Sequence, residues 1–156
     1  EDKFKCYVAN DNSVGQIVVS GNIIELNKFS EELKKNKIKN IKLPVSAPFH
    51  CELMKSATVK MSKEITKVEF KKPEIDIISN VTAQQTNDPN HIKRLLIEQI
   101  ESPVRWREIV INMIDSGVEK FVEIGPGKVL SGLVKRINSN VNLIQVNEIE
   151  DLNKLI

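Results

Sequence analysis

The sequence predicts an α/β fold, in which strands and helices alternate along a chain of 156 residues. Short β-branched and aromatic runs recur between longer segments whose apolar residues have helical spacing. With 40% hydrophobic residues, the chain is long enough to bury one ordinary core, or part of a larger one. The alternation favours a mainly parallel sheet over a helical bundle.

Composition argues against several classes of protein. The net charge is +2, so no large basic field indicates nucleic acid. The longest apolar runs have about five or six residues, far short of the roughly 20 that span a bilayer. Cys6 and Cys51 lack the spacing of zinc ligands, so we expect reduced thiols and no metal. The first residue is Glu1, which suggests a cut or processed product.

The N-terminal third predicts a hairpin, a helix and a further strand. Residues 1–21 have the composition of a hairpin, with the polar segment NDNSVG (10–15) as its tight connection. An amphipathic helix follows and ends near Asn36. Its apolar face consists of Ile23, Leu26, Phe29 and Leu33. Residues 38–45, IKNIKLPV, alternate well enough for another strand.

The middle of the chain predicts a long helix, a buried strand and a second helix. The long helix begins at or just after His50. Its apolar stripe consists of Leu53, Ala57, Met61, Ile65 and Val68. Residues 74–79, EIDIIS, form a candidate buried strand. Asp88 before Pro89 predicts the start of the next helix, because Asp caps and proline tolerates the first helical position.

The C-terminal part predicts two helices and two strands. A helix begins near Pro103 and ends at Gly117, and residues 119–125 return to strand composition. GPGKVLSGLVKRI then turns into another helix, and residues 141–146 supply a last strand. The GPGK turn (125–128) invites a phosphate-loop interpretation, but no Ser or Thr follows the lysine, so we expect an ordinary strand-to-helix turn.

His50 is the main candidate for chemistry. A histidine at a helix start is a candidate general base, although many such residues only pack or donate hydrogen bonds. Its neighbour Cys51 is not a suitable partner, because adjacent helical residues point in different directions. We expect Cys51 to pack and His91 to lie on the surface. Its position alone does not decide whether His50 is a general base or a packing residue.

Several other residues have a structural and a functional interpretation. Asn10 and Asn12 could donate hydrogen bonds in a site, but asparagines in turns usually satisfy their own backbone. Trp106 has the spacing of a core residue. Arg105 and Arg107 flank it and are expected on the solvated side of the helix.

Five segments in order resemble the C-terminal half of malonyl-CoA:acyl carrier protein transacylases. They are NDNSVGQIVVSG, LPVSAPFHCELM, ISNVTA, SPVRW and FVEIGPGKVLSGLVKRI. The resemblance implies an α/β-hydrolase-like large subdomain with a ferredoxin-like small subdomain inserted into it. Residues 1–43 would form the C-terminal part of the small subdomain, and residues 44–156 the C-terminal part of the large one.

In this family a serine on a G-x-S-x-G elbow attacks the malonyl thioester, and a histidine accepts the serine proton. The resemblance places that histidine at His50. It implies that the backbone carbonyl of Arg105 orients His50, that Asn10 and Asn12 lie beside the substrate, and that Phe49 disfavours an α-methyl branch. The substrates would be malonyl-CoA and acyl carrier protein, without a cofactor or metal.

No G-x-S-x-G occurs in the sequence, so the nucleophile is absent. The oxyanion-hole amides and the arginine for the malonyl carboxylate belong to the N-terminal half, and none of Arg94, Arg105, Arg107 or Arg136 aligns with that arginine. We therefore expect a fragment that needs the N-terminal half as a partner. Two alternatives are an acyltransferase fragment of a polyketide synthase and a fragment that only binds carrier protein. Lys, Asn and Ile are frequent, as expected when a genome is rich in A and T. Such a genome fits a bacterium or an apicomplexan plastid, so we expect the bacterial cytoplasm or the plastid stroma.

Overall fold

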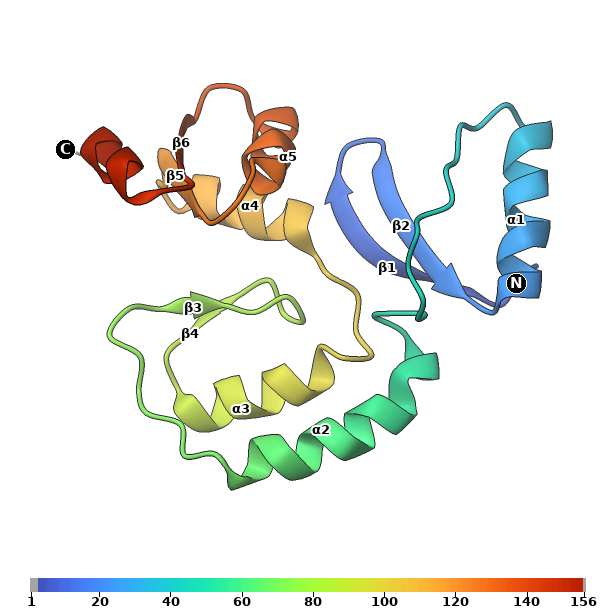
Figure 1. Cartoon of the computed structure of the whole chain (residues 1–156), viewed down its shortest axis with the longest axis horizontal. Coiled ribbons are helices and arrows are strands. Elements are labelled where there is room, and N and C mark those ends of the chain that lie inside the picture. Colours follow the sequence, from blue (N-terminus) through green and yellow to red (C-terminus); the bar gives the residue numbers. More distant parts are fainter. Residues whose placement is uncertain (1–2, 156) are drawn as a thin grey trace.

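The computed structural model describes residues 3–155 and shows an α/β fold in three groups of elements (Figure 1). The elements in order are β1 (Cys6–Ser13), β2 (Gln16–Gly21), α1 (Ile23–Lys35), η1 (Glu52–Met54), α2 (Lys55–Lys67), β3 (Ile77–Ile78), β4 (Gln85–Thr86), α3 (Pro89–Glu98), α4 (Trp106–Asp115), β5 (Lys120–Ile124), α5 (Val129–Ile137), β6 (Asn142–Val146) and η2 (Ile149–Leu155). One group contains β1, β2 and α1, a second contains α2, α3, β3 and β4, and a third contains α4, β5, α5 and β6.

The predicted hairpin is confirmed in β1 and β2, which pair antiparallel. Its connection is shorter than the predicted 10–15, because β1 continues to Ser13 and the turn consists of Val14 and Gly15. Gly15 has a φ of +74°, which glycine adopts at little cost. Residues 1 and 2 of the predicted hairpin lie outside the described residues.

The strand predicted at residues 38–45 is wrong. This segment contains no helix or strand, and Ile41 is 75% exposed. An alternating sequence becomes a strand only where another strand accepts and donates its backbone hydrogen bonds. Within residues 3–155 no strand pairs with this segment.

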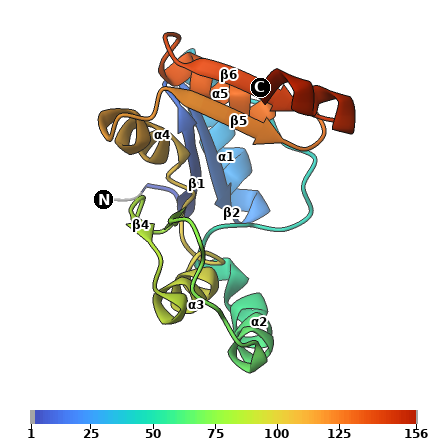
Figure 2. The ribbon, with the colours of Figure 1, turned by 90° about the vertical axis from the view of Figure 1, so that its left-hand side faces the viewer.

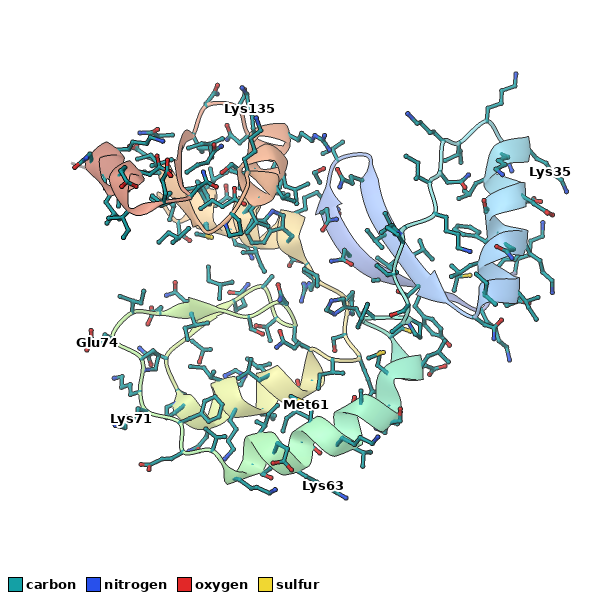
Figure 3. The ribbon with its side chains drawn as sticks, in the orientation of Figure 1. Lys35, Met61, Lys63, Lys71, Glu74 and Lys135 are labelled. Carbon is teal, nitrogen blue, oxygen red and sulfur yellow. The ribbon has the colours of Figure 1, made fainter. Side chains whose placement is uncertain are left out.

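The helices α2 and α3 pack side by side below the rest of the chain (Figures 1 and 2). Figure 3 shows Met61 on the side of α2 toward α3 and Lys63 on the opposite side. The predicted apolar stripe is only partly buried, because Leu53, Met61 and Val68 each remain about half exposed. The short helix η1 precedes α2, so the regular helix begins later than predicted from His50. The predicted cap of α3 is confirmed, because the Asp88 carboxylate accepts a hydrogen bond from the Asn90 amide at 3.0 Å.

The prediction of a buried strand at 74–79 is only partly met. Only Ile77 and Ile78 form a strand, β3, which pairs antiparallel with β4. Ile75 is 80% exposed. Apolar composition indicated burial here, but no element of residues 3–155 covers this side chain.

The mainly parallel sheet is also not observed. In the described residues, β5 and β6 form a parallel pair joined through α5, while the other two sheets are antiparallel pairs. Ile124 at the end of β5 is 77% exposed. Parallel sheets are normally covered on both faces, so this pair has the character of part of a larger sheet.

The core lies where the hairpin meets the C-terminal group. Val110 of α4 is fully buried, and Val134 of α5 and Ala9 of β1 are nearly so. Figure 2 shows the hairpin beside α4, with β5 and β6 above it. Within residues 3–155 no helix is both long and apolar enough to cross a membrane.

The hydrogen bonds at the C-terminal end of α1 require a residue in the left-handed backbone conformation, which is usually glycine. The Lys37 amide donates to the Lys34 carbonyl at 2.9 Å, and the Ile38 amide donates to the Leu33 carbonyl at 2.8 Å. This pair of bonds places Lys37 in the left-handed region, with a φ of +58°. A side chain with a Cβ atom costs about 1–2 kcal/mol in that region.

We predict that Lys37→Gly raises the free energy of unfolding by about 0.5 kcal/mol, since the relief of strain exceeds the extra freedom of glycine in the unfolded chain. Thermal unfolding should show a midpoint about 1–2 °C higher. Lys39→Gly is the matched control, because Lys39 is exposed without a positive φ, and its midpoint should stay the same or fall. Equal losses in both variants would contradict the prediction.

The N-terminus of α5 is capped from a neighbouring strand. The Glu123 carboxylate accepts hydrogen bonds from the Leu130 amide at 2.9 Å, the Ser131 amide at 2.7 Å and the Ser131 hydroxyl at 2.6 Å. Burial tends to raise the pKa of Glu123, but the hydrogen bonds from Ser131, Leu130 and Val129 outweigh this effect and hold the pKa below its ordinary value of 4.5.

We predict that Glu123→Ala lowers the free energy of unfolding by about 1 kcal/mol at neutral pH, as the loss of other helix caps does. Because the folded pKa is lowered, the stabilisation is complete above pH 4.5 and is lost as the pH falls through the folded pKa. Urea unfolding at several pH values should therefore show the two proteins converging in acid. Glu119→Ala removes an exposed carboxylate just before β5 and should change little.

Candidate active site

His50 lies in the turn between residues 38–45 and η1 and has a φ of +60°. This left-handed conformation is uncommon outside glycine and is found at functional sites where the surroundings impose it. Cys51 after it is extended, with a φ of −151° and a ψ of 171°. His50 therefore lies just before the first helical turn, in agreement with the prediction that the helix begins at or just after it.

The ring of His50 contacts the C-terminal end of α3. Its Nδ1 atom lies 3.2 Å from the backbone carbonyl oxygen of Gln99, the residue that caps this helix. The last carbonyls of a helix have no partner within it, so they are free to accept other hydrogen bonds. Because a carbonyl only accepts, Nδ1 carries the hydrogen and Nε2 keeps its lone pair.

The carbonyl predicted for this role, that of Arg105, is the wrong one. The Arg105 carbonyl accepts the Ile109 amide at 3.0 Å and so belongs to the first turn of α4. The Arg105 side chain donates to the Glu108 carboxylate at 2.6 and 2.7 Å and to the Val81 carbonyl at 2.9 Å. The sequence could not identify Gln99 as the residue whose carbonyl contacts His50, because every residue has a backbone carbonyl. Only the path of the backbone decides which carbonyl lies beside the ring.

Each arginine of the chain already has a side-chain partner. Arg107 donates to both carboxylate oxygens of Asp11 through its Nε and Nη2 atoms, and these hydrogen bonds raise the pKa of Arg107. Arg94 pairs with Glu98 at 3.4 Å. Arg136 donates to Gln16. All four arginine side chains are therefore engaged in contacts within the described residues.

Asn10 and Asn12 lie on β1, next to the segment that follows Gln99. The Val104 amide donates to the Ala9 carbonyl at 2.8 Å, and the Asp11 amide donates to the Val104 carbonyl at 2.9 Å. Within residues 3–155, neither the Asn10 nor the Asn12 side chain makes a hydrogen bond, and both residues are half-buried. The segment from Gln99 to Val104 thus joins the His50 contact to Asn10.

Phe49, Cys51 and His91 have different surroundings. Phe49 is 46% exposed in the turn directly before His50. Cys51 is 2% exposed, and its thiol donates to the Pro48 carbonyl at 3.1 Å. It is a packing residue, as predicted. His91 lies in the first turn of α3, at the opposite end from Gln99, and is half-buried rather than fully exposed.

The GPGK turn is not available as an anion site. It joins β5 to α5, and the Glu123 carboxylate already accepts the first amides of that helix. A helix N-terminus occupied by a carboxylate does not attract phosphate. The predicted strand-to-helix turn is confirmed.

The ring of His50 is oriented, and no serine of a G-x-S-x-G elbow accompanies it in the sequence. In the described part of the chain, no group of three or more His, Cys, Asp or Glu side chains could hold a metal ion. Alone, the arrangement can accept a proton from a group that another segment brings to it.

Comparison with known proteins identifies the family. Residues 2–151 match the model of the acyl transferase domain. The malonyl CoA-acyl carrier protein transacylase of Bacillus subtilis is 44% identical over 93% of this chain and 46% of its own length. The enzyme of the same name from Staphylococcus aureus is 41% identical over 92% and 47%.

Solved structures agree with this result. The malonyl CoA-acyl carrier protein transacylase of Clostridium perfringens is 42% identical, with a TM-score of 0.90 over 96% of this chain and 48% of its own. An acyl carrier protein S-malonyltransferase of Vibrio cholerae is 40% identical, with a TM-score of 0.92 over 99% and 51%. The chain spans about half the length of the relatives it matches, and it belongs to the acyl transferase domain family.

Proposed function

We propose that the chain is the C-terminal half of a malonyl-CoA:acyl carrier protein transacylase of type II fatty acid synthesis and supplies its general base, His50. The observation that carries this proposal is the contact of His50 Nδ1 with the Gln99 carbonyl, which leaves Nε2 free to accept a proton. The relatives named above support the reaction class. The absence of a G-x-S-x-G elbow supports assignment to the C-terminal half.

The reaction would take place in two steps. The serine oxygen of the N-terminal half attacks the malonyl thioester carbonyl while His50 Nε2 accepts its proton. The C–S bond breaks, and the proton on His50 passes to the departing coenzyme A thiolate. The pantetheine thiol of acyl carrier protein then gives its proton to His50 and attacks the malonyl-serine ester, and His50 returns the proton to the serine.

Three other residues would set the substrate site. Asn10 and Asn12 would donate amide hydrogen bonds to the substrate, since their side chains have no protein partner in residues 3–155. The exposed ring of Phe49 would disfavour an α-methyl branch beside the reacting carbonyl. A malonyl-transacylase solved in complex with a type II polyketide synthase acyl carrier protein is 33% identical to this chain and supports an acyl carrier protein as the acceptor.

The N-terminal half would also complete the fold. In the described residues β5 pairs only with β6, so one edge of β5 remains open for a further strand. The buried indole N–H of Trp106 has no acceptor within residues 3–155. Because buried donors are usually satisfied, we infer that the other half supplies this acceptor. On this proposal, residues 1–43 belong to the ferredoxin-like small subdomain and residues 44–156 to the α/β-hydrolase-like large one.

We predict that the chain forms no malonyl adduct alone, but supports one on a companion N-terminal half that carries the serine elbow. Intact-mass spectrometry of the mixture after malonyl-CoA is added measures the adduct. His50→Ala should slow its formation by about 10²–10⁴-fold, the usual contribution of a general base. His91→Ala, which alters the only other histidine, is the matched control and should leave the rate unchanged.

Three results would contradict the proposal. An adduct on this chain alone would show a different nucleophile. An adduct that forms at the same rate in the wild type and in His50→Ala would show that His50 is not the general base. Binding of carrier protein to the two-chain mixture without any acyl-serine would favour the fragment that only binds carrier protein, while preferential transfer to a polyketide carrier would favour the polyketide alternative.

A further inference from the structure

The left-handed backbone of His50 has to be held by its neighbours. A non-glycine residue with a φ of +60° persists only where surrounding contacts over-determine it. On one side of His50, the buried thiol of Cys51 donates to the Pro48 carbonyl at 3.1 Å and closes the turn. On the other side, the Met54 amide donates to the Cys51 carbonyl at 2.9 Å and starts η1.

One side chain of η1 reaches outside this segment. The Glu52 carboxylate accepts a hydrogen bond from the phenol of Tyr7, on β1. These residues are 45 positions apart, so the bond ties the hairpin to the segment that follows His50. The hydrogen bond to Glu52, followed by burial, raises the pKa of Tyr7 to about 12, so the phenol remains a donor at neutral pH.

The Tyr7–Glu52 bond connects the two parts of the candidate site. β1 carries Asn10 and pairs with Val104, while Glu52 lies two residues after His50. If Glu52 is released, η1 is held to the rest of the chain by fewer contacts, and His50 can leave the left-handed region. Its Nδ1 would then lose the Gln99 carbonyl.

We propose that Tyr7 and Glu52 are positioning residues for His50, and that their hydrogen bond keeps His50 in the left-handed conformation in which Nδ1 reaches the Gln99 carbonyl. The bond acts on the histidine through the backbone of η1. The effect of this bond on malonyl transfer rests on the function proposed above, whereas its effect on the ring of His50 does not.

The first test observes the ring itself. The full chain is prepared with ¹⁵N-histidine, so that only His50 and His91 give imidazole signals, and spectra are recorded in mildly alkaline buffer. In the wild type, His50 should show the tautomer protonated at Nδ1. Tyr7→Phe and Glu52→Ala should shift His50 toward a mixture of tautomers and leave His91 unchanged.

Two further variants separate this effect from a general loss of stability. Glu52→Gln keeps an oxygen that accepts the phenol proton and should retain the wild-type tautomer. Glu64→Ala removes an exposed carboxylate of α2 that pairs with Lys67, and should leave both histidines unchanged. A Glu52→Ala spectrum that equals the wild type, or a Glu64→Ala spectrum with the same shift, overturns the proposal.

The second test measures transfer in the two-chain assembly. Tyr7→Phe and Glu52→Ala should lower kcat by about tenfold, since misplacement of a catalytic group by up to 1 Å costs up to about 10²-fold. KM for malonyl-CoA should stay within about twofold, and Glu52→Gln should restore most of kcat. A raised KM with unchanged kcat overturns the positioning role.

The two tests can fail separately. If the wild-type assembly forms no acyl-serine while Tyr7→Phe still shifts the tautomer of His50, the positioning role stands and the proposed function fails. If transfer occurs but neither Tyr7→Phe nor Glu52→Ala alters the ring of His50, the proposed function stands and the positioning role fails.

Discussion

The backbone pairing of β1 with Val104 is the constraint on which the rest of the site depends. Through two hydrogen bonds it fixes the segment that follows α3 against the middle of the hairpin. That segment begins at Gln99, whose carbonyl contacts His50. The same pairing therefore sets both the acceptor for the histidine and the position of Asn10, although these residues come from three separate parts of the sequence.

The sequence could predict the parts of this arrangement that depend on side-chain type and local spacing. The Asp88–Pro89 pair starts α3, and the apolar stripe places one face of α2 against its neighbour. His50 stands out because few other side chains of the chain can act as a base near neutral pH. The carbonyl that orients His50 and the positive φ of His50 have no such signal, since both follow from the path of the backbone.

The incorrect strand predictions have a common physical origin. Residues 38–45 and 74–79 have the alternation or apolar composition of strands, yet Ile41 and Ile75 are among the most exposed large side chains. A strand is defined by its partners, and a pattern along one segment does not say where a partner lies. Similarly, a mainly parallel sheet was predicted, but within residues 3–155 only β5 and β6 pair in parallel and no third strand lies beside them.

On the proposed function, the contacts that orient His50 lie within this chain and do not depend on the other half. The contacts that hold His50 come from α3, the Pro48 turn and β1, all within residues 3–155. Assembly with the other half would then supply the reacting groups without having to reorganise the histidine. Pre-organisation of this kind lowers the cost of reaching the transition state, because the tautomer and the ring orientation are set before substrate binds.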